Sequence, residues 1–86
     1  MFGRILSLPR FRLATFPTPI ERSIRIGSEL GVDLYFKRDD VMELALGGNK
    51  VRKLEFILGD ALSKGCDTLV TVGALHSNHA RLTAAA

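Results

Sequence analysis

The sequence predicts an α/β fold, and more narrowly a piece of an open parallel sheet in which a helix crosses between two strands. Residues 32–36 (Val-Asp-Leu-Tyr-Phe) and 68–72 (Thr-Leu-Val-Thr-Val) are rich in the β-branched and aromatic residues that strands favour. Between them, apolar residues recur at helical spacing from position 54 to position 62. The order strand, helix, strand defines a βαβ unit, whose crossover we expect to be right-handed.

Composition places this chain among proteins with a packed core. Its 86 residues suffice for one small domain, and 47% of them are hydrophobic. The net charge is +3, but the basic residues are dispersed, so we expect no nucleic-acid partner. The single cysteine, Cys66, excludes an internal disulfide and fits a reducing compartment. No apolar run reaches membrane-spanning or signal-peptide length, so we expect a cytoplasmic protein without a membrane partner.

The segment before the first strand should be irregular and then helical. Residues 1–16 show no clean period and predict an arm that packs through its apolar residues. Residues 16–20 (Phe-Pro-Thr-Pro-Ile) should be extended, because proline disfavours helix at the residue before it. A helix is expected over roughly 20–30, ended by Gly31. The charged run 37–40 (Lys-Arg-Asp-Asp) is interpreted as a solvated strand exit.

The main helix is expected from about Asn49 to Lys64, with Gly65 ending it. Asn49 should cap it through the side-chain oxygen. Lys50 then lies in the first turn, where outward N–H groups and the helix dipole suit an anion and lower the cost of deprotonating an amine. A lysine there could form a Schiff base with a carbonyl group. The buried stripe of this helix is expected to comprise Leu54, Ile57, Leu58, Ala61 and Leu62.

After the second strand, residues 73–79 predict a strand-to-helix loop, and a helix follows from Asn78. The sequence stops inside this alanine-rich helix, after a single βαβ unit. Two strands cannot form a stable parallel sheet that is covered on both faces. We therefore expect a truncated, N-terminal portion of a larger α/β domain, with residues 1–16 as an arm and 17–86 as the start of the core.

Polar residues gather at the carboxyl ends of the two predicted strands, where open α/β sheets bind ligands. They offer an amine, a hydroxyl, amides and an imidazole, which suit a Schiff-base enzyme, although spacing alone does not distinguish this from solvated lysines, a capping serine and a loop histidine. His76 and His79 lack a third ligand nearby in sequence, so no metal is expected. The candidates are Asn49, Lys50, Lys53, Ser77, Asn78 and His79.

Two motifs carry a specific resemblance. They are residues 47–55 (Gly-Gly-Asn-Lys-Val-Arg-Lys-Leu-Glu) and 72–81 (Val-Gly-Ala-Leu-His-Ser-Asn-His-Ala-Arg). The chain resembles the pyridoxal-phosphate-dependent family of 1-aminocyclopropane-1-carboxylate deaminase and D-cysteine desulfhydrase, from about Phe11 onward. Supporting matches are residues 17–19, 37–40, 59–65 and 67–69. The resemblance implies the tryptophan-synthase-β-like fold (pyridoxal-phosphate fold type II), incomplete in this chain.

The resemblance also implies roles for individual residues. Lys50 matches the lysine that forms the Schiff base with pyridoxal 5'-phosphate, with Asn49 beside it, and Lys53 matches a lysine near the cofactor phosphate. Ser77 matches a catalytic serine that contacts the substrate carboxylate. Asn78 matches the asparagine that binds the cofactor 3′-oxygen and also lies on the substrate side. His79, at a substrate-binding position, stands where deaminases commonly have glutamine and desulfhydrase-like members commonly have histidine.

The implied activity is that of a lyase or deaminase acting on a small amino acid. His79 favours D-cysteine desulfhydrase activity, which is β-elimination to pyruvate, ammonia and sulfide. The alternative is 1-aminocyclopropane-1-carboxylate deaminase, which opens the ring to give 2-oxobutanoate and ammonia. An inactive remnant of either enzyme remains a further alternative, and a small nucleic-acid-binding module ranks far below. We expect a homodimer for the full-length protein, and no turnover by the 86 residues alone.

Overall fold

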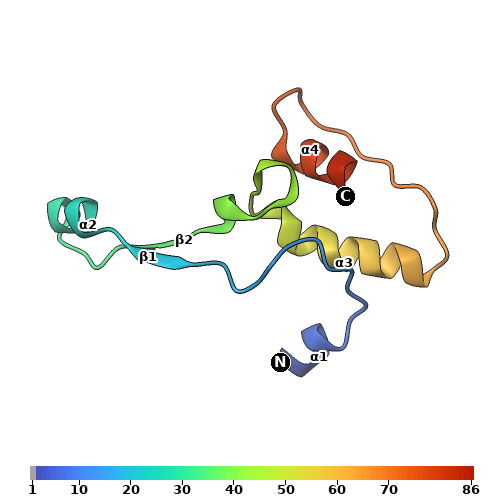
Figure 1. Cartoon of the computed structure of the whole chain (residues 1–86), viewed down its shortest axis with the longest axis horizontal. Helices are drawn as coiled ribbons and strands as arrows, with labels where there is room; N and C mark the ends of the chain where they lie inside the picture. Colours follow the sequence, from blue (N-terminus) through green and yellow to red (C-terminus); the bar gives the residue numbers. More distant parts are fainter. Residues whose placement is uncertain (1) are drawn as a thin grey trace.

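The computed structural model describes residues 2–86 and shows two helices beside each other with a long projecting hairpin (Figure 1). Helices α3 and α4 pack together, and the hairpin extends away from them, which gives extents of 51 × 36 × 19 Å. Within residues 2–86, no helix has the length and apolar character needed to cross a bilayer. The elements are α1 (Phe2–Leu6), β1 (Ile20–Arg22), α2 (Ile24–Leu30), β2 (Tyr35–Lys37), the 3-10 turns η1 (Asp39–Val41) and η2 (Leu44–Leu46), α3 (Lys50–Ser63) and α4 (Asn78–Ala85).

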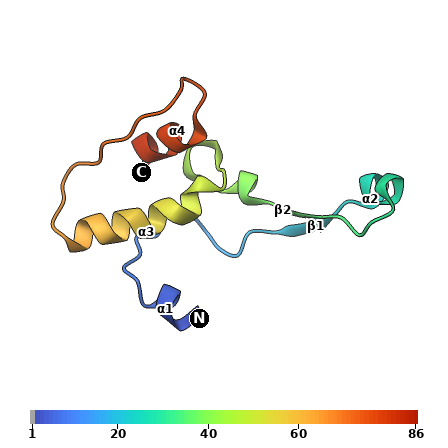
Figure 2. The same cartoon turned by 180° about the vertical axis from the view of Figure 1, so that it is seen from behind.

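The two-stranded sheet is antiparallel and forms the stem of the hairpin, with α2 at its tip (Figure 2). Ile20 pairs with Lys37 and Arg22 with Tyr35. The predicted helix over 20–30 is therefore wrong in its first part, because residues 20–22 pair with β2 and the helix begins at Ile24. Its predicted end at Gly31 is confirmed. Gly31 has φ 68°, and its N–H donates to the carbonyl oxygens of Gly27 and Ser28 in the last turn of the helix.

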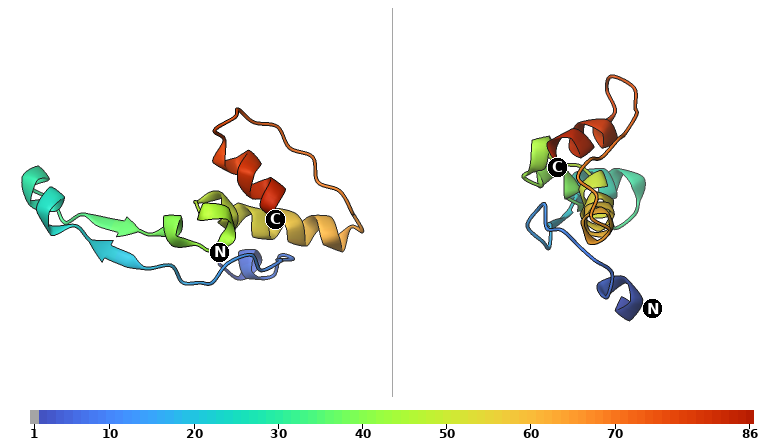
Figure 3. Two further views of the ribbon diagram at one scale, coloured as in Figure 1. Left: turned by 45° about the horizontal axis from the view of Figure 1, so that its top comes forward. Right: turned by 90° about the vertical axis from the view of Figure 1, so that its right-hand side faces the viewer.

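Residues 68–72, predicted to be a strand, form an extended stretch of the connection between α3 and α4 without a ladder partner among residues 2–86 (Figure 3). Val70 and Val72 are 90% and 89% exposed. A parallel strand needs neighbours that supply hydrogen bonds and cover both faces. The described residues provide neither, so the predicted parallel pairing of 68–72 with the first strand does not form here.

Helix α3 is the centre of the core, but its buried face is rotated from the predicted stripe. Val51, Leu54 and Leu58 are buried as expected of an apolar face, whereas Ile57 and Leu62 are 44% and 53% exposed. Part of the predicted apolar stripe is therefore packed against the other described residues, and part of it faces solvent. The core cluster comprises Met42, Val51, Leu54 and Leu82.

The arm that precedes β1 explains this rotation. Its first part is the short helix α1 rather than the irregular coil predicted for residues 1–16, and its second part runs along α3. The Phe11 N–H donates to the Glu55 carbonyl at 2.9 Å. A Cβ on Gly59 would lie only 2.4 Å from the Pro9 carbonyl carbon, so glycine permits this close approach. Glu55, which is not a member of the predicted apolar stripe, is fully buried beneath the arm.

Candidate functional site

The turn immediately before α3 is unusual in its backbone. Four successive residues have positive φ angles, namely 42° at Ala45, 70° at Leu46, 68° at Gly47 and 132° at Gly48. This region is costly for residues with a Cβ, and such costs concentrate at functional sites. A Cβ on Gly47 would lie 2.6 Å from the carbonyl oxygen of Asp40. The turn is therefore tightly packed, and the chain continues from it through Asn49 to Lys50.

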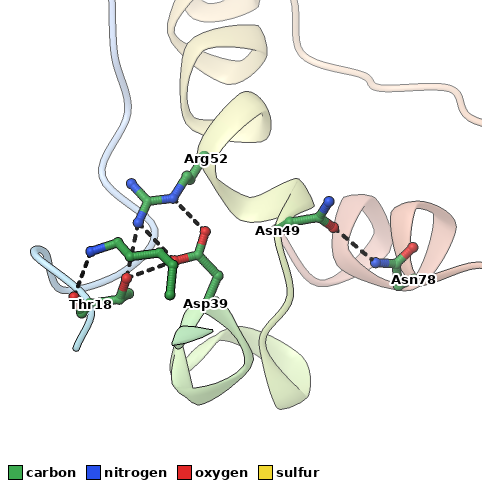
Figure 4. Close-up of polar contacts among 6 residues, drawn as sticks. Thr18, Asp39, Asn49, Arg52 and Asn78 are labelled. Atoms are coloured by element: carbon green, nitrogen blue, oxygen red, sulfur yellow. Dashed lines mark hydrogen bonds and ion pairs between the residues drawn. The ribbon is translucent and has the colours of Figure 1, made fainter. Parts of the chain in front are cut away.

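Lys50 is the first residue of α3, as predicted to within one residue, and is half-buried. Asn49 occupies the N-cap position, but its side chain makes no capping hydrogen bond because its backbone is already helical (φ −60°, ψ −19°). The predicted capping role is therefore wrong. The Asn49 Oδ1 atom instead accepts a hydrogen bond from Asn78 Nδ2 at 3.4 Å (Figure 4).

Helix α4 begins at Asn78, as predicted, and Ser77 caps it. The Ser77 Oγ atom accepts from the Ala80 N–H at 3.2 Å. A hydroxyl that accepts in this way still has its O–H to donate. A Cβ on Gly73 would lie 2.8 Å from Ser77 Oγ, so the absence of a side chain there makes room for the serine. Ser77 is thus fixed in position, and its O–H remains available to donate a hydrogen bond.

Two hydrogen bonds fix α4 against the turn that precedes Lys50. Besides the bond between Asn78 and Asn49, Arg81 Nη2 donates to the Gly47 carbonyl oxygen at 2.9 Å. A Cβ on Gly48 would contact Asn78 Nδ2 at 3.5 Å. The structure therefore brings the start of α3 and the start of α4 together, and with them two positive helix ends.

Lys53 and His79 are the remaining predicted site residues. Lys53 is exposed on α3, one turn beyond Lys50. His79 Nε2 lies 3.2 Å from Thr71 Oγ1, so its ring is held against the α3–α4 connection, while its Nδ1 is buried without a partner among the residues described. Within residues 2–86, no three His, Cys, Asp or Glu side chains gather as they would around a metal ion.

A polar cluster that the sequence did not single out lies beside the start of α3 (Figure 4). Asp39 accepts from Arg52 Nε at 2.5 Å and from Arg52 Nη2 at 2.8 Å, and it accepts from Thr18 Oγ1 at 2.7 Å. These hydrogen bonds, chiefly those from Arg52, lower the pKa of Asp39 from 3.8 to about 2. Asp39 was interpreted as part of a solvated strand exit, yet its side chain is only 15% exposed. Asp39 and Arg52 are 13 residues apart in the sequence, so no local sequence pattern predicts that they pair.

Residues 11–86 match the family model described as pyridoxal-phosphate dependent enzyme. The chain therefore belongs to the pyridoxal-phosphate-dependent enzymes. Its similarity to the deaminase and desulfhydrase branch of that family, predicted from the two motifs, is confirmed by the individual relatives and by a solved structure.

The chain is 63% identical over 78 residues to a Pyrococcus abyssi protein provisionally named 1-aminocyclopropane-1-carboxylate deaminase, covering 91% of this chain and 24% of that protein. It is 55% identical over 82 residues to the D-cysteine desulfhydrase of Yersinia enterocolitica, covering 95% of this chain and 25% of that enzyme. A crystal structure of an ACC deaminase homologue superposes with a TM-score of 0.91 at 52% identity, covering 98% of this chain and 26% of that one. The chain thus spans about a quarter of the length of these relatives.

The α/β class predicted from the sequence holds, and the chain corresponds to about a quarter of the solved homologue. Residues 68–72 have the composition of a buried parallel strand, and the solved homologue has a chain about four times as long to surround such a segment.

Proposed function

We propose that this chain supplies the lysine-bearing part of the active site of a pyridoxal-phosphate-dependent lyase that acts on a small amino acid, with D-cysteine as the preferred substrate. The observation that carries the proposal is the contact between Asn49 and Asn78. It joins the start of α3, which carries Lys50, to the start of α4, which carries Ser77 and Asn78. The sequence relatives named D-cysteine desulfhydrase and 1-aminocyclopropane-1-carboxylate deaminase support the reaction class.

The donor set fits pyridoxal 5'-phosphate. The cofactor has a carbonyl carbon for an amine, a phosphate for positive charge and a 3′-oxygen for an amide donor. Two adjacent helix N-termini and the lysines of α3 provide positive potential for its phosphate and for a substrate carboxylate. When bound, the cofactor supplies an electron sink for the carbanion at the substrate Cα.

The proposal assigns a separate role toward the cofactor to each of the residues at the start of the two helices. Lys50 Nζ would hold the cofactor at its carbonyl carbon, and the same amine would move a proton at the substrate Cα. Asn78 has two amide protons; one is donated to Asn49, which leaves the second for the cofactor 3′-oxygen. Asn49 therefore acts by orienting the Asn78 amide. Lys53, one turn further along α3, provides charge for the phosphate.

The substrate side is assigned to the start of α4. The free O–H of Ser77 donates to the substrate carboxylate and takes part in catalysis, while its oxygen continues to cap the helix. His79 follows as a substrate-side residue, and its ring is held by Thr71. The proposal includes a homodimeric, cytoplasmic enzyme at full natural length, supported by the sequence resemblance and by the single cysteine.

The test is to trap the cofactor on the protein at its full natural length. Pyridoxal phosphate is added, the adduct is reduced with borohydride, and the modified residue is found by peptide mass spectrometry. We expect selective label on Lys50, followed by pyruvate and sulfide release from D-cysteine. Release of 2-oxobutanoate from 1-aminocyclopropane-1-carboxylate would instead identify the deaminase. Absence of label on Lys50 would refute the proposal, and pyruvate formed by the isolated 86 residues would refute our expectation that they are inactive alone.

A further inference from the structure

Asp39 contacts the chain on both sides of Lys50. Its carbonyl oxygen accepts from the Gly48 N–H at 2.9 Å, and its carboxylate accepts two hydrogen bonds from Arg52. Gly48 and Arg52 lie two residues before and two residues after Lys50. One residue of η1 therefore fixes both the backbone at Gly48 and the first turn of α3; Figure 4 shows its contact with Arg52.

The side chains around Asp39 form a hydrogen-bonded cluster. Thr18 is 5% exposed; its Oγ1 donates to Asp39 at 2.7 Å and accepts from Arg52 Nη2 at 3.0 Å. Lys37 Nζ donates to the Thr18 carbonyl at 2.6 Å. The Arg52 guanidinium lies 4.7 Å from the centre of the Phe16 ring. The arm, the η1 turn and α3 thus meet at a single carboxylate.

Asp39 is more buried than the carboxylate of an exposed ion pair on α3. The pair between Asp60 and Lys64 on the same helix is exposed at both ends, 56% and 67%, and such pairs contribute little. Asp39 is 15% exposed and holds Arg52 in a fork, which fixes direction as well as distance. The fork also lies next to a turn with two non-glycine residues at positive φ, where the surroundings must hold the backbone in place.

We propose that Asp39 is a positioning residue for Lys50, which through Gly48 and Arg52 fixes the direction in which the Lys50 amine is presented. The proposal rests on the function proposed above. It assigns to the Asp39–Arg52–Thr18 cluster the task of holding the amine in line with the carbonyl that it attacks. Reacting groups displaced by about 1 Å lose rate by about a hundredfold, so such support has a measurable effect.

The test uses the Asp39→Asn variant of the protein at full natural length, without cofactor. Trace acetylation with acetic anhydride, read by peptide mass spectrometry, gives the labelling of Lys50 relative to Lys53 on the same helix. Asparagine keeps the shape but loses the charge that holds the fork, so the first turn loosens. We expect the Lys50:Lys53 ratio to rise at least about threefold. In the loaded enzyme, kcat should fall about tenfold or more with a smaller change in KM.

Matched variants separate positioning from general stability. Glu55→Gln weakens the same helix without touching Asp39, and Asp60→Asn removes an exposed ion pair of α3. Both should leave the ratio unchanged. Arg52→Lys keeps the charge but cannot form the fork, so it should raise the ratio in the same direction. If Asp39→Asn does not fold, Arg52→Lys alone decides the question.

The outcomes are distinguishable. A ratio that stays at the wild-type value in Asp39→Asn, or in Arg52→Lys where the former does not fold, would overturn the positioning role. A rise of equal size in Glu55→Gln would overturn it as well, because loss of stability would then suffice. Failure of borohydride to fix pyridoxal phosphate on Lys50 of the wild-type protein tests the proposed function separately, since acetylation of the lysines does not require cofactor.

Discussion

The buried carboxylate of Glu55 accepts a hydrogen bond from Arg10 Nε at 2.5 Å. Its other oxygen accepts from the backbone N–H groups of Leu13, at 2.8 Å, and Ala14, at 3.2 Å. A charge at 0% exposure is tolerated only when it is paired and hydrogen-bonded, and these three donors meet that need. Glu55 thereby fastens the N-terminal arm to the helix that begins with Lys50.

Replacing Glu55 with alanine should therefore release the arm. The substitution strands the Arg10 guanidinium, which is 25% exposed, and two backbone N–H groups. Breaking a buried pair from one side lowers the free energy of unfolding by about 3–5 kcal/mol. Chemical denaturation of the full-length protein measures the loss, and limited proteolysis should cut within residues 9–16 first. Asp60→Ala should cost no more than about 0.5 kcal/mol; equal losses in the two variants would contradict the assignment.

The pH dependence of stability should contain a contribution from Asp39. Its folded pKa is about 2, below the ordinary 3.8, mainly because Arg52 donates to it. The unfolded state therefore binds the proton more readily. The stabilisation is fully present above about pH 4 and is lost as the pH falls toward 2. Its size is about 1–2 kcal/mol, because the Arg52 side chain is 41% exposed and solvent screens the pair.

The Asp39→Asn variant isolates this contribution. The free energy of unfolding is measured between pH 2 and pH 6 for both proteins, and the difference between them is compared. We expect the difference to be largest above about pH 4 and to shrink toward pH 2, because asparagine does not titrate. A difference independent of pH over this range would show that the Asp39 carboxylate is not held by Arg52.

Local signals in the sequence located most of the helices. Gly31 has no Cβ to oppose a positive φ, and Ser77 is a favoured capping residue, so both helix boundaries were predictable. The start of α3 was predicted to within one residue, although the Asn49 side-chain cap on which that prediction relied does not form. The family motif added chemical roles for Lys50 and its neighbours that periodicity alone does not carry.

What the sequence did not reveal depends on distant partners. Residues 20–22 become a strand because they pair with residues 35–37, and local propensity does not report that pairing. Glu55 has its partner Arg10 45 residues away, so no local pattern in the sequence marks this carboxylate as buried. Asp39 and Arg52 are hidden for the same reason. These long-range ion pairs fix the arm and the turn against α3, although no periodic pattern marks them.

Two glycines that share the same positive φ should respond differently to alanine. Gly47 and Gly31 both have φ +68°, but Gly31 is left-handed with ψ 31°, whereas Gly47 has ψ −170°, a region that is essentially restricted to glycine. A Cβ at Gly47 would lie 2.6 Å and 2.8 Å from two carbonyl oxygens, whereas nothing lies within 4 Å of one at Gly31. Gly31→Ala should cost about 1 kcal/mol from the left-handed conformation alone. Gly47→Ala should cost clearly more and should weaken borohydride trapping on Lys50; equal costs, measured by denaturation, would mean that the turn is loose.

Ser77 has two separable tasks, and three substitutions distinguish them. Alanine removes both the cap and the O–H donor, and losing the cap costs about 1 kcal/mol of stability. Aspartate restores the cap through a carboxylate oxygen but has no proton to donate, and its charge repels a substrate carboxylate. Threonine keeps both functions. We therefore expect the wild type and the threonine and aspartate variants to be similarly stable, and all three to be more stable than the alanine variant. We expect kcat/KM on D-cysteine to be retained only with serine or threonine at position 77. Activity in Ser77→Asp close to that of the wild type would reduce Ser77 to a helix cap, because the oxygen that accepts from Ala80 would then be the only part of the side chain that matters.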